Sequence, residues 1–129
     1  MLNLKGKSVL VVEDDEMCYL YLRQIFNLTG CSLLRAETGK EALYLFRNNH
    51  FDIILMDIRL PDIDGTQVTR EIRLSDRDIP IIAQTAGNTM DEVEKAMEAG
   101  CSEVLVKPFT METLFGAISR HYGNGITSV

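Results

Sequence analysis

Side chains that can take part in phosphoryl chemistry follow four short apolar runs of the chain. They are Glu13 and Asp14, then Asp57, Thr85 and Lys107. Carboxylates bind hard cations such as Mg²⁺ through oxygen, and a carboxylate can also act as a nucleophile that forms an aspartyl-phosphate. A lysine ammonium binds phosphate oxygens, and a threonine hydroxyl can donate a hydrogen bond to one of them. Together these residue types predict a site that accepts a phosphoryl group with Mg²⁺ as its cofactor.

Each of these residues has an ordinary structural interpretation when it is taken alone. An acidic cluster such as 13–15 is typical of a helix N-terminus, Thr85 of the end of a strand, and Lys107 of a solvated surface. Segment 62–65, Asp-Ile-Asp-Gly, is typical of a turn that caps a helix. The functional interpretation therefore depends on whether the fold brings the reactive side chains to one place.

Strand and helix signals alternate along the whole chain. The predicted strands are 8–12, 31–36, 52–56, 80–84 and 102–106, and the predicted helices are 15–29, 38–48, 65–74, 89–99 and 110–122. Five strand–helix repeats predict an α/β fold, a doubly wound five-stranded parallel sheet with five helices. The carboxyl ends of parallel strands lie at one edge of a sheet, where ligands bind in such folds, so the reactive side chains should converge there.

Three of the predicted helices begin with recognisable capping residues. Thr38 with Glu41, and Thr89 with Glu92, have the spacing of a capping box, in which both side chains accept from backbone amides. Thr110 is expected to cap the last helix. These assignments give Glu41 and Glu92 local roles at helix starts.

The composition is that of one globular domain, with 129 residues, 46% of them hydrophobic. The net charge of −6 and the lack of a run of Lys or Arg argue against direct binding of nucleic acid. Cys18, Cys31 and Cys101 lack metal-ligand spacing and are expected to be reduced thiols. No segment has the pattern of a membrane span or a signal peptide, so we expect a cytoplasmic protein, or the cytoplasmic piece of a larger one.

Four segments resemble the motifs of the receiver domains of two-component signalling, the response-regulator fold. They are 11–15 (Val-Val-Glu-Asp-Asp), 55–65 (Leu-Met-Asp-Ile-Arg-Leu-Pro-Asp-Ile-Asp-Gly), 81–86 (Ile-Ile-Ala-Gln-Thr-Ala) and 106–109 (Val-Lys-Pro-Phe). The resemblance covers residues 6–122 and leaves 123–129 as a tail or the start of a linker. It implies a flavodoxin-like sheet with strand order 2-1-3-4-5.

The resemblance also implies a role for each marked residue. Asp57 is the phosphoacceptor, Asp14 a direct Mg²⁺ ligand, and Glu13 a ligand acting mainly through water. The backbone carbonyl of Arg59 is a further ligand, Thr85 is the switch hydroxyl, and Lys107, with a cis bond to Pro108, binds the phosphoryl group. The implied donor is a phosphohistidine on a sensor histidine kinase or a histidine phosphotransfer protein.

Two residues set this chain apart from the family pattern. Val104 stands three residues before Lys107, where the family often has a Tyr or Phe ring that moves inward with the switch hydroxyl. Arg59, two residues after Asp57, is either a solvated loop charge or a guanidinium over the acidic site. In the second case we expect it to pair with Glu13 or to shield the phosphoaspartate from water.

The predicted first helix has a second apolar stripe beside the reactive edge of the sheet. Cys18, Tyr21 and Leu22 form this stripe, and Pro108 and Phe109 follow the last strand nearby. A well-buried helix would explain the stripe by itself. The family resemblance implies instead that these five residues contact the partner that carries the histidine.

Several functions agree with this site. The first is a receiver domain that relays a signal and catalyses only its own phosphorylation and dephosphorylation. It acts either alone on a downstream target that the sequence does not identify, or as the receiver module of a hybrid sensor histidine kinase that passes phosphate to a histidine carrier. The alternatives are a protein-binding module that works without phosphorylation and a small aspartyl-phosphate phosphatase, although no insertion is present to form a substrate pocket.

Overall fold

A five-stranded parallel sheet forms the centre of the computed structural model, which describes residues 2–87, 89–122 and 127–128. The strands are β2 (Ser8–Val12), β3 (Ser32–Ala36), β4 (Ile53–Asp57), β5 (Ile81–Thr85) and β6 (Glu103–Val106). Their spatial order is β3-β2-β4-β5-β6. Counted within this sheet alone, that is the expected order 2-1-3-4-5, and the predicted α/β fold is confirmed.

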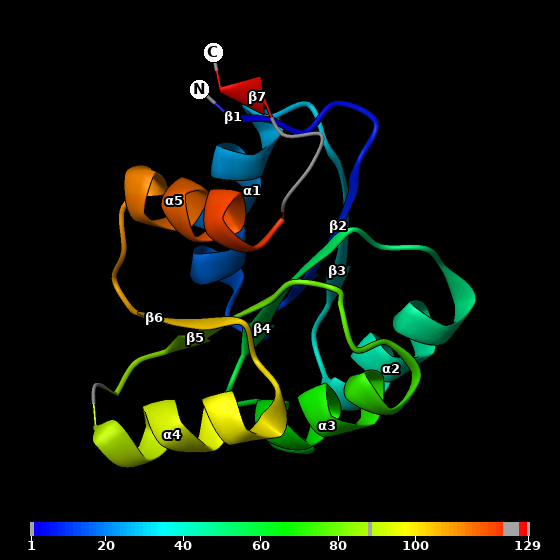
Figure 1. Ribbon diagram of the computed structural model, residues 1–129, viewed down its shortest axis with the longest axis vertical. Helices are drawn as coiled ribbons and strands as arrows, with labels where there is room; N and C mark the ends of the chain where they lie inside the picture. Colours follow the sequence, from blue (N-terminus) through cyan, green and yellow to red (C-terminus); the bar gives the residue numbers. More distant parts are fainter. Residues whose placement is uncertain (1, 88, 123–126, 129) are drawn as a thin grey trace.

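Helices cover both faces of the sheet, as Figure 1 shows. Helices α1 (Glu16–Asn27) and α5 (Met111–His121) lie on one face, and α2 (Gly39–Asn48), α3 (Gly65–Ser75) and α4 (Met90–Ala99) lie on the other. A side chain just before each helix accepts a backbone amide of its first turn, as expected of N-caps. These caps are Asp15, Thr38, Asp64, Thr89 and Thr110.

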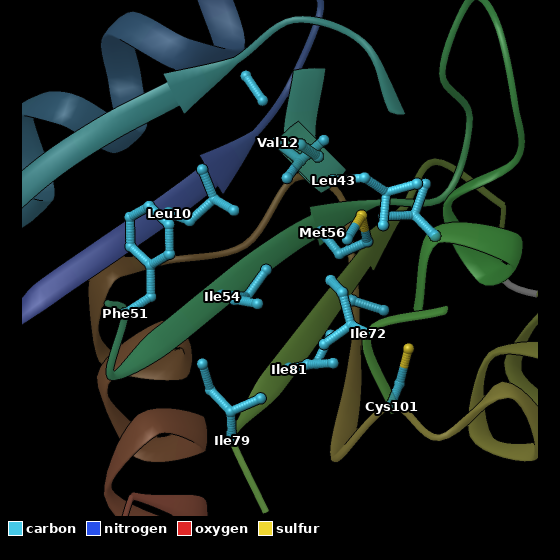
Figure 2. Packing of buried hydrophobic residues seen from close by; sticks show 14 of the residues in the cluster. Leu10, Val12, Leu43, Phe51, Ile54, Met56, Ile72, Ile79, Ile81 and Cys101 are labelled. Carbon is cyan, nitrogen blue, oxygen red and sulfur yellow. The ribbon is translucent and has the colours of Figure 1, made fainter. Parts of the chain in front are cut away.

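Successive residues of the central strands pack into opposite layers. Leu10, Ile54 and Ile81 contribute to the layer beneath α2, α3 and α4, which Figure 2 shows from close by. Val11 and Leu55, one position further along their strands, pack with α1 and α5 instead. All five side chains are fully buried. Because both faces of the sheet are covered, the central strands are apolar at most positions and show no regular alternation with polar residues.

The predicted elements all exist, and their ends differ from the prediction by at most two residues. The shift that matters is in β4, which extends through Asp57, so the backbone of that residue pairs with Gln84 of β5. The sequence did not predict the antiparallel pair of β1 (Leu2–Asn3) with β7 (Thr127–Ser128). Within the predicted tail, 123–126 and 129 lie outside the described residues.

The structure also bears on the predictions about membrane spans and cysteines. No helix among the described residues has the length and apolar character that a membrane crossing would need. Cys18, Cys31 and Cys101 are free cysteines, and Cys101 is buried in the layer shown in Figure 2.

Candidate functional site

Three carboxylates meet at the carboxyl edge of the sheet, where the sequence predicts them. One oxygen from each of Glu13, Asp14 and Asp57 lies within 4.8 Å of the others, and we call this group the acid pocket. Glu13 is fully buried, Asp57 is 5% exposed, and Asp14 is exposed to solvent. Because β2 and β4 are neighbours in the sheet, their ends bring like charges together, which is unfavourable unless a cation is near.

The Lys107 ammonium lies between the two buried carboxylates of the acid pocket. Its Nζ atom is 3.0 Å from Glu13 Oε1 and 3.2 Å from Asp57 Oδ2. Lys107 follows β6, and its backbone amide donates to the carbonyl of Thr85 over 2.8 Å. The bond from Lys107 to Pro108 is cis, as expected. Lys107 therefore offsets part of the negative charge and is placed to contact any group attached to Asp57.

Gln84 completes the hydrogen bonding of the Glu13 carboxylate. Its Nε2 atom donates to Glu13 Oε1 over 2.9 Å, and the backbone amide of Asp15 donates to Oε2 over 3.2 Å. Gln84 lies in β5 and is 1% exposed. Every buried polar side-chain atom of the described residues has a hydrogen-bond partner, which is how buried polar groups avoid a large desolvation cost.

The surroundings shift the proton affinities of two members of this network. Burial, followed by the hydrogen bond and charge of Asp57, raises the pKa of Glu13 from its ordinary 4.5 to about 7, although Lys107 opposes the shift. Burial alone would lower the pKa of Lys107, but its hydrogen bond to Glu13 and the charge of Asp57 raise the pKa overall. Lys107 is therefore charged at neutral pH, while Glu13 without a metal is partly protonated.

Arg35 of β3 holds the loop that carries Glu13 and Asp14. Its Nε atom donates to the backbone carbonyl of Glu13 over 3.1 Å, and Nη2 donates to that of Asp14 over 3.3 Å. The guanidinium also pairs with Glu16 at 2.8 Å and lies 4.4 Å from the centre of the Tyr19 ring. A planar guanidinium suits both kinds of contact. Arg35 thus supports the acid pocket through the backbone, without touching its carboxylates.

The loop after β4 passes so close to the end of the strand that only glycine fits at the start of α3. A Cβ atom on Gly65 would overlap the backbone oxygen of Asp57 and lie 2.9 Å from the Cα of Ile58. Nearby, the Asp62 carboxylate accepts from the first two backbone amides of α2, at 2.8 and 2.9 Å. Segment 62–65 therefore has the turn and capping role that its sequence suggests, and it also fixes the backbone at Asp57.

Arg59 does not pair with Glu13, so that expectation is wrong. Its Nη2 atom is 2.6 Å from Glu92 Oε1 on α4, and its side chain is 70% exposed. The oxygens of Glu13 are buried and already bonded to Lys107, Gln84 and the Asp15 amide, so a surface guanidinium has no access to them. Only the backbone amide of Arg59 contacts the acid pocket, donating to Asp57 Oδ1 over 3.0 Å.

Thr85 also bonds to Glu92. Its hydroxyl donates to Glu92 Oε2 over 2.7 Å and accepts from the Gly87 amide over 3.2 Å. Thr89 does cap α4, because the Glu92 amide donates to its hydroxyl over 3.3 Å. The Glu92 carboxylate, however, turns to Thr85 and Arg59 instead of returning to Thr89, so the second half of the predicted capping box is wrong. The hydrogen bonds from Thr85 and Arg59 lower the pKa of Glu92.

Val104 lies on β6, half-buried against the layer formed with α2, α3 and α4. It stands beside Ala83 of β5 in the sheet register. The residue is therefore packed near the strand that ends in Thr85. Its part in any switch remains a prediction, as does that of the Thr85 hydroxyl.

The residues expected to contact a partner come together in one groove. Cys18, Tyr21 and Leu22 from α1, with Pro108 and Phe109, line a cavity of about 240 Å³ that also reaches Met17, Gln84 and Lys107. The Tyr21 hydroxyl donates to the Phe109 carbonyl over 2.8 Å, which joins the two walls. We call this cavity the α1 groove. It opens next to the acid pocket, since Lys107 lines the groove and also pairs with Glu13 and Asp57.

Sequence reasoning missed three residues that the structure adds to the site. Gln84 could have been noticed, because it is a polar residue in an otherwise apolar strand. Arg35 and Glu92 carry no such signal, since their partners are distant in sequence and their charges are ordinary for a strand end and a helix start. Their roles depend on the packing of β3 beside β2 and of α4 beside the loop after β4.

The acid pocket fits a divalent magnesium ion by the chemistry of its donors. Its three carboxylates offer hard oxygen ligands close together, and one of them, Asp14, is open to solvent. Magnesium prefers a few carboxylates together with water, so a partly solvated site of this kind suits it. Asp14, Asp57 and the backbone carbonyl of Arg59 would hold the ion, and Glu13 would act through water.

Comparison with known proteins identifies the family to which this arrangement belongs. The profile described as "Response regulator receiver domain" matches residues 9–119. The chain is 35% identical over 120 residues to the polar-differentiation response regulator DivK of Brucella ovis, covering 92% of this chain and 98% of DivK. It is also 35% identical over 113 residues to the transcription factor SKN7 of Candida albicans, covering 88% of this chain but 20% of SKN7.

Solved structures agree with this similarity. The receiver domain of the sensor histidine kinase PA1611 of Pseudomonas aeruginosa, which has a magnesium ion in its active site cleft, matches with a TM-score of 0.85 and 33% identity, covering 92% of this chain and 99% of that one. A putative response regulator from Chloroflexus aurantiacus matches with a TM-score of 0.87 and 28% identity, covering 92% and 98%. This chain belongs to the response regulator receiver domain family of two-component signalling, and its acid pocket is typical of the phosphoacceptor site of that family.

Proposed function

We propose that Asp57 accepts a phosphoryl group from a phosphohistidine on a partner protein and that the change in charge is the signal. The observation that carries this proposal is the position of Asp57, with its carboxylate between the Lys107 ammonium at 3.2 Å and the Arg59 amide at 3.0 Å. The carboxylate also lies beside Asp14, which is exposed to solvent, so a donor would approach Asp57 from the side of Asp14.

The transfer step needs a nucleophile and compensation for negative charge. An Asp57 oxygen attacks phosphorus, the new O–P bond forms, and the N–P bond breaks with its electron pair returning to the imidazole of the donor. Lys107 contacts Asp57 and so meets the charge that gathers on the phosphoryl oxygens. Mg²⁺, when bound by the carboxylates of the acid pocket, would supply further positive charge to those oxygens. The protein then catalyses only its own phosphorylation and the later hydrolysis of the phosphoaspartate.

Phosphorylation with a small-molecule donor tests this function directly. Acetyl phosphate with Mg²⁺ should add one phosphoryl group to the intact protein, seen as a mass increase, and Asp57→Asn should abolish it. Asp52→Asn is a matched control, because Asp52 precedes the same strand at its opposite end. Incorporation that persists in Asp57→Asn, or none in the native chain, would contradict the assignment of Asp57.

We infer that the histidine-bearing partner, a sensor histidine kinase or a histidine phosphotransfer protein, docks on the α1 groove. The groove is lined mainly by apolar side chains and reaches Lys107, which pairs with Asp57, so a helix seated there would bring its histidine to Asp57. Tyr21 is 45% exposed and Pro108 is exposed, which leaves both accessible to a partner.

The location that we propose for the protein is the cytoplasm. The free cysteines of the described residues suit a reducing compartment of this kind.

A second arrangement is the receiver module of a larger protein, such as a hybrid sensor histidine kinase. It is favoured by the similarity to the receiver domain of PA1611 and by the match to only a fifth of SKN7, whereas the match to DivK covers almost all of that protein. The length of the complete gene product distinguishes the two arrangements. In either arrangement we propose that the receiver domain comprises residues 6–122.

A further inference from the structure

Glu92 gathers two hydrogen-bond donors at the rim of the acid pocket. The Thr85 hydroxyl is 2.7 Å from one carboxylate oxygen of Glu92, and the Arg59 guanidinium is 2.6 Å from the other. Thr85 is almost fully buried, and the Glu92 side chain is 24% exposed. A partly shielded carboxylate on α4 thus holds one donor from the end of β5 and one from the loop after β4.

Both donors belong to segments that also contact Asp57 or Lys107. The backbone amide of Arg59 donates to Asp57 Oδ1, and the carbonyl of Thr85 accepts from the Lys107 amide. A phosphoryl group on Asp57 would present several anionic oxygens to the same rim. Such oxygens are strong acceptors for a guanidinium and a hydroxyl, so they would compete with the Glu92 carboxylate for these two donors.

Gly87 provides the space that lets Glu92 reach Thr85. A Cβ atom at this position would overlap Glu92 Oε2 and lie 3.0 Å from its Cδ. These atoms are the end of a flexible side chain, so an alanine there can be accommodated if the carboxylate moves away. Gly87→Ala is therefore a way to displace the Glu92 carboxylate without changing the residue itself.

We propose that Glu92 is a positioning residue that holds Thr85 and Arg59 away from Asp57 until the site is phosphorylated. The contacts of Glu92 stabilise the unphosphorylated arrangement, so phosphorylation has to break them and thereby releases the start of α4. This inference rests on the proposed function, because it requires a phosphoryl group on Asp57. It assigns to α4 a specific link to the site, through a residue whose sequence position suggested only a helix cap.

Binding of beryllofluoride, a phosphoryl mimic, tests the inference at saturating Mg²⁺. The chain has no tryptophan, so the backbone amide signal of Arg59, which donates to Asp57, is a suitable reporter of the midpoint concentration in ¹⁵N–¹H NMR spectra. Glu92→Ala should lower that midpoint by about three- to tenfold, since loss of a competing contact tightens binding of the mimic. Glu92→Gln keeps one acceptor oxygen but no charge and should give a smaller decrease. The control is Glu94→Gln, an exposed residue of the same helix, which should leave the midpoint unchanged.

The direction of the change separates positioning from general support of the fold. A variant that merely loosens the structure binds the mimic more weakly, whereas loss of the proposed contacts makes binding tighter. An unchanged or raised midpoint in Glu92→Ala would overturn the inference. If the native protein itself does not bind beryllofluoride, the proposed function is contradicted together with the inference. If the native protein binds it and Glu92→Ala binds it no more tightly, only the inference is contradicted.

Gly87→Ala gives an independent measurement that leaves Glu92 itself unchanged, and an unchanged or raised midpoint in this variant would overturn the inference. It should lower the midpoint in the native background, because its methyl group displaces the carboxylate. In a chain that already carries Glu92→Ala the same change should have no further effect, since nothing remains to be displaced. Equal effects of Gly87→Ala in both backgrounds would show that it does not act through Glu92, and would overturn the inference.

Discussion

The side-chain amide of Gln84 lies 2.9 Å from the Glu13 carboxylate and reaches it across β4, the strand that separates β5 from β2. Both side chains are almost completely shielded from solvent. This bond joins the ends of β5 and β2 across the strand that lies between them, beneath the acid pocket. The position of the buried Glu13 carboxylate therefore depends on the neutral amide of Gln84 as well as on the charged Lys107.

Replacing the amide should disturb both stability and metal binding. Gln84→Leu removes a donor from the buried Glu13 carboxylate, so the free energy of unfolding should fall by about 1–3 kcal/mol and the affinity for Mg²⁺ should change with it. Urea unfolding and calorimetric titration with Mg²⁺ measure the two effects. Gln67→Leu, at an exposed position of α3, is the matched control. Equal unfolding free energies for the two variants would contradict a role for the Gln84 bond.

The proton affinity of Glu13 predicts how stability depends on pH when no metal is present. The folded protein has a pKa of about 7 at Glu13, against an ordinary value of 4.5, so between these values only the folded state holds the proton. The contribution of Glu13 to the unfolding free energy is therefore fully present below pH 4.5 and is lost as the pH rises to about 7. The loss should be on the order of 1–3 kcal/mol.

Unfolding in urea with a chelator, repeated across this pH range, measures the dependence. Glu13→Gln cannot titrate and should remove this component of the slope. Saturating Mg²⁺ should also reduce it, because a cation favours the ionised carboxylate. A native pH dependence identical to that of Glu13→Gln would show that Glu13 titrates normally.

Arg59→Ala should shorten the lifetime of the phosphoaspartate. Glu92 holds the guanidinium in the unphosphorylated chain, and we expect it to turn to the phosphoryl oxygens and shield them from water once Asp57 is phosphorylated, so hydrolysis without it should become faster on the order of a few-fold. The decay of phosphorylated protein after removal of the donor measures the rate. Arg70→Ala, exposed on α3, provides the control. The shielding idea fails if the lifetime in Arg59→Ala equals that of the native protein.

Tyr21→Glu should impair phosphoryl transfer from the cognate histidine protein. A charge in the α1 groove would face the apolar surface of the partner, and the transfer rate at subsaturating partner should fall by about tenfold or more. Phosphorylation by acetyl phosphate should change little, which separates docking from chemistry. Tyr44→Glu is the control, since Tyr44 is 65% exposed on α2, on the opposite face of the sheet. Unimpaired transfer would exclude this surface.

Gly65→Ala should destabilise the protein by about 1–3 kcal/mol, because its methyl group would overlap the backbone oxygen of Asp57, which cannot move aside freely. Thermal unfolding measures the loss. Gly116→Ala in α5 is a useful contrast, since the nearest atom to its Cβ would be the end of the Arg120 side chain, at 3.3 Å. That change should be neutral or stabilising, as alanine favours a helix over glycine. Equal melting temperatures for the two variants would contradict the close packing at Gly65.

The fold and the centre of the site could be predicted from sequence because their signals are local. Each strand is a short apolar run, and Glu13, Asp57 and Thr85 each stand where such a run ends, so the parallel topology alone brings them together. The family resemblance then supplied the order of the strands. The cis bond before Pro108 and the residues of the α1 groove followed from the same resemblance.

The contacts of Glu92 and Arg59 could not be predicted in this way. A Thr-x-x-Glu spacing at a helix start favours a capping box, and nothing in the sequence indicates that the glutamate will find better donors elsewhere. Whether the Arg59 guanidinium turns inward or outward depends on which acceptors remain free after the pocket has packed. Glu13 was already bonded, and α4 offered an accessible carboxylate, so tertiary packing decided the outcome.

The contact between Glu13 and Lys107 joins residues that are 94 positions apart in the sequence, so the acid pocket is complete only when the whole domain has folded. Its carboxylates lie at the ends of β2 and β4, and Lys107 follows β6, so an intermediate that lacks any of these strands has no complete site. Ions or phosphoryl mimics that bind only the assembled pocket must then stabilise the whole chain by mass action. Mg²⁺ should therefore raise the melting temperature of the whole domain, and it could rescue destabilised variants in the same way.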